Sequence, residues 1–210
     1  MSQESVPQHS VQAPDALVPT QDFQHKAQIV QWLKLDCQRW FSLLVACEVA
    51  NRFAVSDYWL AAGFVRNLVW DHLHQLPKQP LSDIDFVFFD NTRTDIAFER
   101  EIEAALMASA PDLPWSVKNQ ARMHLRNDDR PYTSVVDAMG FWPEQETAVG
   151  VKLVTVGKLD IVSAFGLNTL FSCQLTPNPQ RSLSVFDRRV RDKGWLTTYP
   201  KLHIVKEGTV

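Results

Sequence analysis

Apolar residues recur along the chain with two different periods, and the changes between them predict the order of the elements. Helical spacing extends over 23–51, 64–76 and 95–109. Short apolar runs lie between these segments, at 57–62 and 83–89, and are typical of buried strands. This order of helices and strands predicts an α/β or α+β fold with a small mixed sheet flanked by helices.

The segment 115–125 alternates between apolar and polar residues with one interruption, which predicts a half-buried strand. Its polar face carries three basic residues, Lys118, Arg122 and His124. Asn119 is the only polar residue on the apolar face. The basic face is interpreted either as the lining of a groove or as an ordinary solvated surface.

The C-terminal part predicts shorter elements. Helices are expected over 134–141 and 166–173, and Gly157-Lys158 predicts a hairpin between strands 149–156 and 159–162. A final helix up to Gly194 carries a basic run, which is interpreted as an RNA contact or, more simply, as a solvated helix face. The members of that run are Arg188, Arg189, Arg191 and Lys193.

Composition narrows the class of protein. A chain of 210 residues that is 45% hydrophobic can build one sizeable core, which we place at 23–210, after a polar and flexible arm over 1–22. The net charge of −3 and the pI of about 6.1 argue against general affinity for nucleic acid. Three scattered cysteines exclude a disulfide framework, so we expect no disulfide-linked partner. We further expect no membrane association and a cytoplasmic location.

Two carboxylates, Asp83 and Asp85, open the second predicted strand. Residues i and i+2 of a strand point to the same face, so these side chains should lie side by side. Adjacent carboxylates repel each other unless a cation neutralises them, and Mg²⁺ binds carboxylate and phosphate oxygens together. The pair is therefore compatible with a metal site for a nucleoside triphosphate, although on its own it is more simply interpreted as turn residues that lead into a strand.

Gly63 lies between the first predicted strand and a helix. Glycine permits close approach of the backbone, and a helix N-terminus offers free N–H groups to a phosphate. Arg66, in the first turn, could bind phosphate oxygens with two hydrogen bonds. Taken alone, the two residues are more simply interpreted as a turn glycine and a surface arginine.

In combination these motifs resemble the polymerase-β-like nucleotidyltransferase superfamily. Residues 63–67 are similar to the Gly-Gly-x-Val-Arg-Asp segment of tRNA nucleotidyltransferases and poly(A) polymerases, and Asp83-Ile84-Asp85 is similar to their Asp-x-Asp. Phe64 departs from the usual small residue and Asn67 from the usual Asp. The chain from about residue 25 also resembles a bacterial family of nucleotidyltransferase-like proteins. The blocks that carry this resemblance are 62–71, 82–90, 115–124, 147–151, 165–167 and 193–195.

The resemblance implies two Mg²⁺ (or Mn²⁺) ions on Asp83 and Asp85, one holding the triphosphate and one activating an acceptor hydroxyl. Attack at the α-phosphorus would then release pyrophosphate. The superfamily normally adds a third carboxylate on a neighbouring strand. Asn119 is one candidate for that place and Asp160 is another, although Asp160 also fits an outward-facing hairpin position.

The resemblance also implies the binding partners. We expect an NTP bound by Gly63, Phe64 and Arg66, with Lys118, Arg122 and His124 lining a groove for the triphosphate or the acceptor. The acceptor itself, whether protein, RNA or small molecule, stays open. Because no third carboxylate is obvious, an inactive nucleotide-binding or regulatory module on the same fold is the alternative function. An RNA-binding accessory protein is a third possibility, against which the acidic pI argues.

Overall fold

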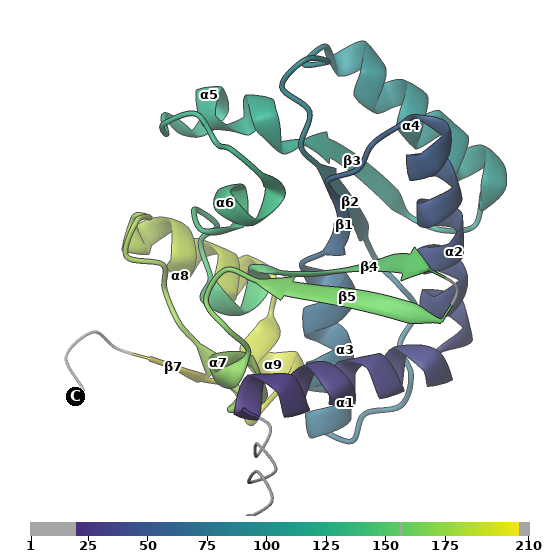
Figure 1. Cartoon of the computed structure of the whole chain (residues 1–210). Coiled ribbons are helices and arrows are strands. Elements are labelled where there is room, and N and C mark those ends of the chain that lie inside the picture. The colour runs from purple at the N-terminus through teal and green to yellow at the C-terminus, as the bar shows by residue number, and fades with distance from the viewer. Residues whose placement is uncertain (1–19, 156, 206–210) are drawn as a thin grey trace, which may run out of the picture.

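The computed structural model describes residues 20–155 and 157–205, and a five-stranded sheet lies at its centre (Figure 1). The strand order is β3-β2-β1-β4-β5, in which β2 and β3 are parallel and the other neighbours are antiparallel. The strands are β1 (Tyr58–Ala61), β2 (Ile84–Phe88), β3 (Trp115–Asn119), β4 (Val149–Thr155) and β5 (Lys158–Ser163). This small mixed sheet with flanking helices confirms the predicted fold class.

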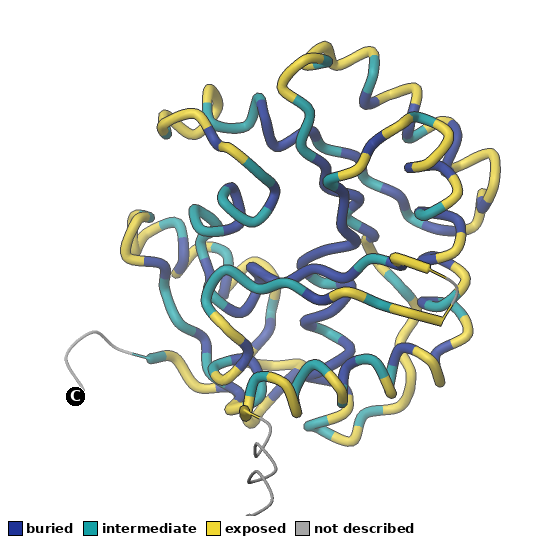
Figure 2. Tube along the Cα trace, viewed as in Figure 1, coloured by how far each residue is buried: buried dark blue, intermediate teal, exposed yellow. Residues whose placement is uncertain are grey.

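Four long helices cover one face of the sheet and enclose the main core with it (Figure 1). They are α1 (Gln21–Leu35), α2 (Cys37–Arg52), α3 (Gly63–Leu73) and α4 (Ile96–Ser109). Ile84, Phe86 and Phe88 of β2 point into this core and are fully buried. Burying each such side chain stabilises the fold by about 1.5–3 kcal/mol. Figure 2 shows the buried residues concentrated along the central strands, with exposed residues at the outer turns.

The other face of the sheet carries a smaller apolar cluster and leaves room for a site. Trp59, Ala61 and Val87 pack there against α6 (Val135–Met139). Side chains alternate along a strand, so Asp85 of β2 points to this same face as Val87. The core that buries one side of β2 thereby directs Asp85 toward the opposite side.

The C-terminal elements fold back beside α3. They are η2 (Gln145–Thr147), α7 (Asn168–Phe171), α8 (Leu183–Asp192), α9 (Trp195–Thr198) and a two-stranded parallel sheet of β6 (Gln174–Leu175) and β7 (His203–Ile204). Trp70 of α3 meets Trp195 and Tyr199 edge to face, with ring centroids 5.8 and 5.3 Å apart. The Tyr199 hydroxyl also donates a hydrogen bond to Asp71 (2.9 Å). These contacts join α9 to the helix that follows β1.

The predicted helix over 23–51 is two helices, because Asp36 interrupts it. Asp36 has extended backbone angles, and its side chain accepts hydrogen bonds from the amides of Gln38 and Arg39 (3.1 and 3.2 Å). An aspartate in this role is a favoured N-cap, so a new helix begins at Cys37. The predicted arm over 1–22 lies outside the described residues except for its last three, where Thr20 caps α1 and the helix begins at Gln21.

The predicted strand over 115–125 is wrong beyond Asn119. The Asn119 side-chain oxygen accepts a hydrogen bond from the amide of Ala121 (3.0 Å), which starts a 3₁₀ turn, η1 (Gln120–Arg122). The helix α5 (Met123–Asn127) follows directly. Alternation over so few residues is compatible with a strand that ends in short helical turns. Of the predicted basic face, only Lys118 lies on the strand.

The predicted hairpin after residue 149 is present. β4 and β5 pair antiparallel, with Thr155 opposite Lys158 and Lys152 opposite Asp160. Residue 156, which the predicted first strand included, lies outside the described residues. Among the described helices, none is long and apolar enough to cross a membrane.

Candidate active site

The turn from β1 into α3 has an unusual backbone. Ala62 adopts φ 54° and ψ −120°, a left-handed conformation that L side chains rarely adopt. Its carbonyl accepts from the amides of Val65 and Arg66 (3.2 and 2.9 Å). The Ala62 amide also donates to the carbonyl of Val149 of β4 (2.9 Å). Hydrogen bonds to both α3 and β4 therefore fix the turn. Gly63 follows and lines the pocket at the start of α3.

This turn also corrects how the chain fits the Gly-Gly-x-Val-Arg-Asp pattern. That pattern has six positions, and residues 62–67 supply six, so Ala62 takes the place of the first glycine and Gly63 that of the second. The positive φ of Ala62 is what a glycine there would allow. Phe64 is not a departure at a small-residue position, since its side chain is fully buried in the main core. Only its backbone is near the turn.

Arg66 is a buried and fixed cation. It is only 6% exposed and packs against the rings of Trp70 and Trp195, with its guanidinium carbon 4.9 and 4.4 Å from the ring centroids. One guanidinium nitrogen, Nη1, donates to Thr147 (2.6 Å), and Nε and Nη2 donate to the side-chain oxygen of Asn67 (3.2 and 3.0 Å). Burial lowers the pKa of Arg66 to about 10, so the group stays charged at neutral pH. Because these contacts already fix the Arg66 side chain, it need not become ordered when an anion binds.

Asp83 and Asp85 face this cation across the pocket. Asp83 is exposed just before β2, and Asp85 is half-buried as the second residue of β2. Burial, and then the charge of Asp83, raise the pKa of Asp85 to about 6, while Arg66, Lys193 and Arg189 act against that shift. The pKa of Asp85 stays high although three cations lie near it, because burial and the adjacent carboxylate outweigh the effect of those charges. That is the environment in which a divalent cation is stabilised.

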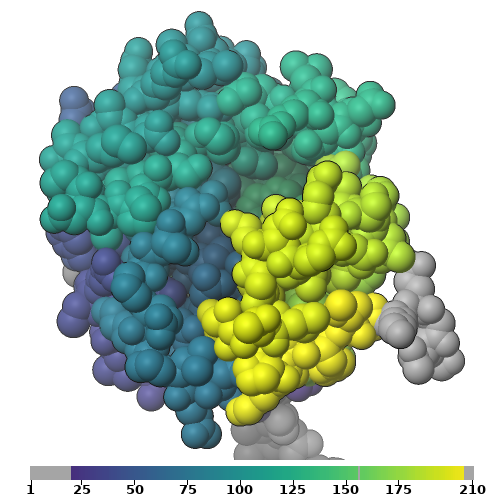
Figure 3. Space-filling view, turned by 180° about the vertical axis from the view of Figure 1, so that it is seen from behind, coloured from purple at the N-terminus to yellow at the C-terminus, as the bar shows by residue number. Residues whose placement is uncertain are grey.

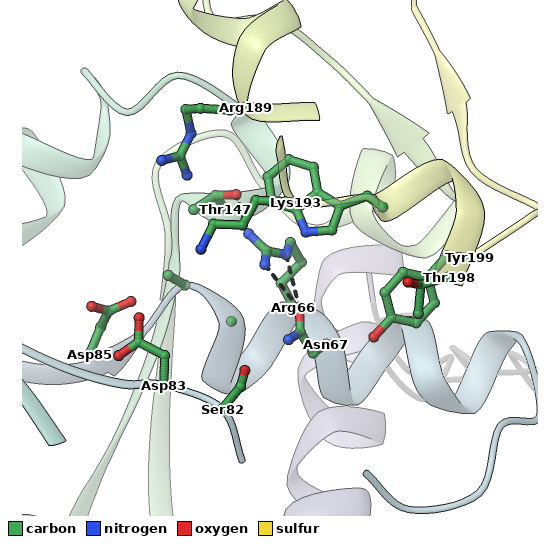
Figure 4. Close-up of a pocket in the computed structure, with 13 residues that line it drawn as sticks. Arg66, Asn67, Ser82, Asp83, Asp85, Thr147, Arg189, Lys193, Thr198 and Tyr199 are labelled. Carbon is green, nitrogen blue, oxygen red and sulfur yellow. Dashed lines mark hydrogen bonds between the residues drawn. The ribbon is translucent and has the colours of Figure 1, made fainter. Parts of the chain in front are cut away.

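Two further cations reach the pocket from the C-terminal part of the chain (Figure 4). Arg189 of α8 and Lys193, at the end of that helix, line a cavity of about 240 Å³ together with the carboxylate pair. Arg189 is oriented by the fully buried Glu144, which accepts from its Nε and Nη2 (2.5 and 3.2 Å). The spacing of Arg189 and Lys193 is a sequence signal for their shared place at the cavity, because residues four positions apart lie on the same face of a helix. The adjacent basic residues Arg188 and Arg191 make that spacing hard to recognise within the run.

The structure does not bring Asn119 to the carboxylate pair. Asn119 is fully buried at the far end of β3, and its amide group donates to the carbonyls of Asp90 and Arg93 (2.8 and 3.0 Å). Its oxygen accepts from the amides of Asp90 and Ala121. In the strand register the partner of Asp85 on β3 is Ser116. Asn119 thus joins two loops by hydrogen bonds and does not lie with the carboxylate pair, contrary to the prediction.

Asp160 is also far from the pair. It is exposed on β5, and β1 and β4 lie between that strand and β2. Strands in a sheet are about 4.8 Å apart, so three strand spacings separate Asp160 from Asp85, too far to share an ion. Within the described residues, no group of three or more His, Cys, Asp or Glu is placed to hold a metal ion by itself.

The three basic residues predicted on one strand face have separate places. Arg122 pairs with Glu99 through two hydrogen bonds of 2.6 Å, and that ion pair occupies its guanidinium. His124 packs beside the ring of Tyr132 and lines a different hollow, together with Arg122. Lys118 is the one that lies near Asp85, in a second pocket next to the first.

Comparison with known proteins places this arrangement in a family. The family model described as Nucleotidyltransferase matches residues 48–204, so the chain belongs to that family. A solved NMR structure, described as revealing a CCA-adding enzyme head domain, is similar over 86% of this chain and 95% of its own, with a TM-score of 0.74 and 27% identity. The search of curated proteins found no match. The predicted resemblance to nucleotidyltransferases is confirmed, and the matched region contains the whole pocket.

Proposed function

We propose that this protein is a metal-dependent nucleotidyltransferase that moves a nucleoside monophosphate from an NTP to a hydroxyl acceptor and releases pyrophosphate. One observation carries the proposal. Two adjacent carboxylates, of which Asp85 has a pKa raised by burial and by the charge of Asp83, face a helix N-terminus and three cations across one cavity. A triphosphate with its divalent cation supplies the charges that both sides of this cavity require.

The carboxylate pair suits Mg²⁺ or Mn²⁺, because both ions prefer oxygen ligands and are bound in such sites by one or two carboxylates plus substrate phosphates. Asp83 and Asp85 would hold the metal. When bound, it would neutralise charge on the triphosphate and lower the pKa of the acceptor hydroxyl. The pKa of Asp85 is about 6 in the protein without metal, so protonation of this ligand would compete with metal binding below that pH.

The opposite side of the cavity would bind the departing pyrophosphate. The open first turn of α3 at Gly63 and the fixed guanidinium of Arg66 present N–H donors to phosphate oxygens. Lys193 adds a mobile point charge. Arg189 adds a planar guanidinium that Glu144 orients through its Nε and Nη2 and partly neutralises. In the transfer, the acceptor oxygen bonds to the α-phosphorus as the bond to the β-phosphate oxygen breaks. The acceptor proton passes to water.

A second function on the same site is nucleotide binding without turnover. The observation that favours it is that, of the described residues, only two carboxylates line the cavity. The superfamily that the chain resembles normally uses three. A regulatory module of this kind would bind NTP with magnesium, measurable by calorimetry, and would release no pyrophosphate.

The test is incubation with α-³²P-labelled NTPs, Mg²⁺ or Mn²⁺ and cell lysate. Wild type is expected to label an acceptor, and Asp83→Asn with Asp85→Asn to lower the rate by about a thousandfold or more, because the metal ligands are lost. Asp160→Asn is the matched control and should label at the wild-type rate, since it is exposed on β5. Equal labelling by wild type and the double variant would falsify the proposal. Binding without pyrophosphate release would select the regulatory module.

A further inference from the structure

A second pocket of about 310 Å³ adjoins the first, and the two share Ala62, Asp85, Thr147 and Arg189. Asp85 therefore lies where the two pockets meet. In the space-filling view from behind, a hollow separates the C-terminal ridge, in yellow, from the teal segments above it (Figure 3). The second pocket extends from Asp85 away from Gly63 and Lys193, toward β3 and α5.

The lining of this second pocket combines apolar surface with cations. Val87, Met123 and Trp142 supply the apolar part. Lys118 and Arg126 supply the charges, and neither side chain hydrogen-bonds or ion-pairs with another part of residues 20–155 or 157–205. Arg122, close by in the chain, is by contrast held by Glu99. Two cations that no described residue pairs with, in a pocket that an aromatic ring also lines, attract a ligand that has both an anionic group and an apolar portion.

The geometry of phosphoryl transfer decides which substrate this ligand is. The attacking and leaving oxygens lie roughly in line on opposite sides of the phosphorus. If pyrophosphate leaves toward Gly63, Arg66 and Lys193, the acceptor approaches from the other side of Asp85. A nucleobase could also enter the second pocket, but it is neutral and gives no reason for two unpaired cations.

We propose that the second pocket binds the acceptor and that the acceptor is a phosphate-bearing alcohol, with its phosphate on Lys118 and Arg126. The inference rests on the proposed function, because only transfer gives this pocket an acceptor. The phosphate can belong to a small metabolite or to the end of a nucleic acid. Trp142 packs against the apolar part of the molecule, and the hydroxyl points toward Asp85.

Binding is measured on ¹⁵N-labelled protein by NMR, so that the two pockets report separately. Magnesium with α,β-methylene-ATP, which cannot transfer, is expected to shift the signals of Gly63 to Arg66. Glycerol 3-phosphate, ribose 5-phosphate and a 5′-phosphorylated RNA trinucleotide are then added to the nucleotide-bound protein. At least one is expected to shift Lys118 and the Trp142 indole, and which of them does so separates a metabolite from a nucleic-acid end. If the analogue leaves Gly63 unmoved, the proposed function fails, and the phosphate titration still tests the second pocket.

Lys118→Gln with Arg126→Gln tests the assignment of the cations. The Kd of the probe that binds is expected to rise at least about tenfold, while that of the nucleotide analogue stays within about twofold. Lys34→Gln with Arg100→Gln is the matched control, because both residues are exposed on helices of the other sheet face. Three results would overturn the proposal: no probe shifts Lys118, the probes shift only the Gly63 signals, or the double variant weakens the nucleotide instead.

Discussion

The two sides of the candidate site come from regions of the chain that are organised differently. The acidic side is built from neighbouring elements, because β1 leads into α3 and pairs directly with β2, which carries Asp85. The basic side is completed by Arg189 and Lys193 of α8, far later in the chain. The acidic side is thus positioned by sheet hydrogen bonds and core packing. The basic side depends on how the C-terminal helices pack beside α3.

This difference predicts that the two sides respond differently to mutation. Changes on the acidic side should alter the stability of the fold as well as chemistry, since those residues lie on the central strands. Changes at the exposed end of α8 should alter substrate affinity and leave stability intact. Three predictions test this, from the largest expected effect to the smallest.

Asp85→Asn should stabilise the protein without ligand by about 3 kcal/mol at neutral pH while it abolishes metal binding. The pKa of Asp85 is raised from 3.8 to about 6 in the fold, so its ionisation above pH 6 costs folding free energy that a neutral amide does not. The gain should be full above pH 6 and vanish as the pH falls below about 4, because wild-type Asp85 is then protonated in both states. Urea unfolding as a function of pH measures it, with Asp160→Asn as the control. A variant less stable than wild type at pH 7 would contradict this account of Asp85.

Lys193→Gln should raise the KM for NTP about tenfold, which corresponds to roughly 1.4 kcal/mol, with little change in the unfolding midpoint. Lys193 is exposed and contributes one charge to the triphosphate side of the cavity. Arg188→Gln, on the same helix but outside the cavity, is the matched control and should leave the KM unchanged. An equal effect of both variants would show that the overall charge of α8, rather than its geometry, governs nucleotide affinity.

Ala62→Gly should stabilise the fold by about 1 kcal/mol. Alanine at φ 54° and ψ −120° is strained, and removing its Cβ releases more free energy than the added flexibility of the unfolded chain costs. Ala61→Gly provides the control, since Ala61 is buried in regular β1 and its truncation should destabilise. The midpoints of urea unfolding of the two variants, each compared with wild type, measure these changes in stability. If both variants lose stability, the turn is not strained.

The core strands and most helices could be predicted because hydrophobic periodicity reports directly on burial. Two errors show the limit of this signal. At Asp36 a capping side chain broke a helix whose apolar spacing continued through it. At Asn119 a side-chain hydrogen bond ended a strand whose alternation continued to residue 125. In both places one polar side chain satisfied backbone groups locally, an effect that periodicity does not register.

The candidate site was predictable to the extent that its residues lie on consecutive elements. Gly63, Arg66 and Asp83-Ile84-Asp85 could be assigned to one site from their order along the chain. Asp160 could be a candidate from the sequence because the order of the strands in the sheet is not visible there. In the folded sheet β1 and β4 separate β5 from β2, so Asp160 lies too far from Asp85 to share a metal ion. The basic run at 188–193 could be recognised, but not which two of its members point inward.

By itself the sequence determined the class of the fold, the core of the sheet and the acidic half of the site, because these follow from local periodicity and from motifs on adjacent elements. Only the tertiary structure decided that Arg189 and Lys193 complete the cavity and that Lys118 and Arg126 line a second pocket beyond Asp85. The physical reason is that long-range packing, such as that of Trp70 against Trp195, brings these charges together. No periodic pattern along the chain encodes which surfaces meet.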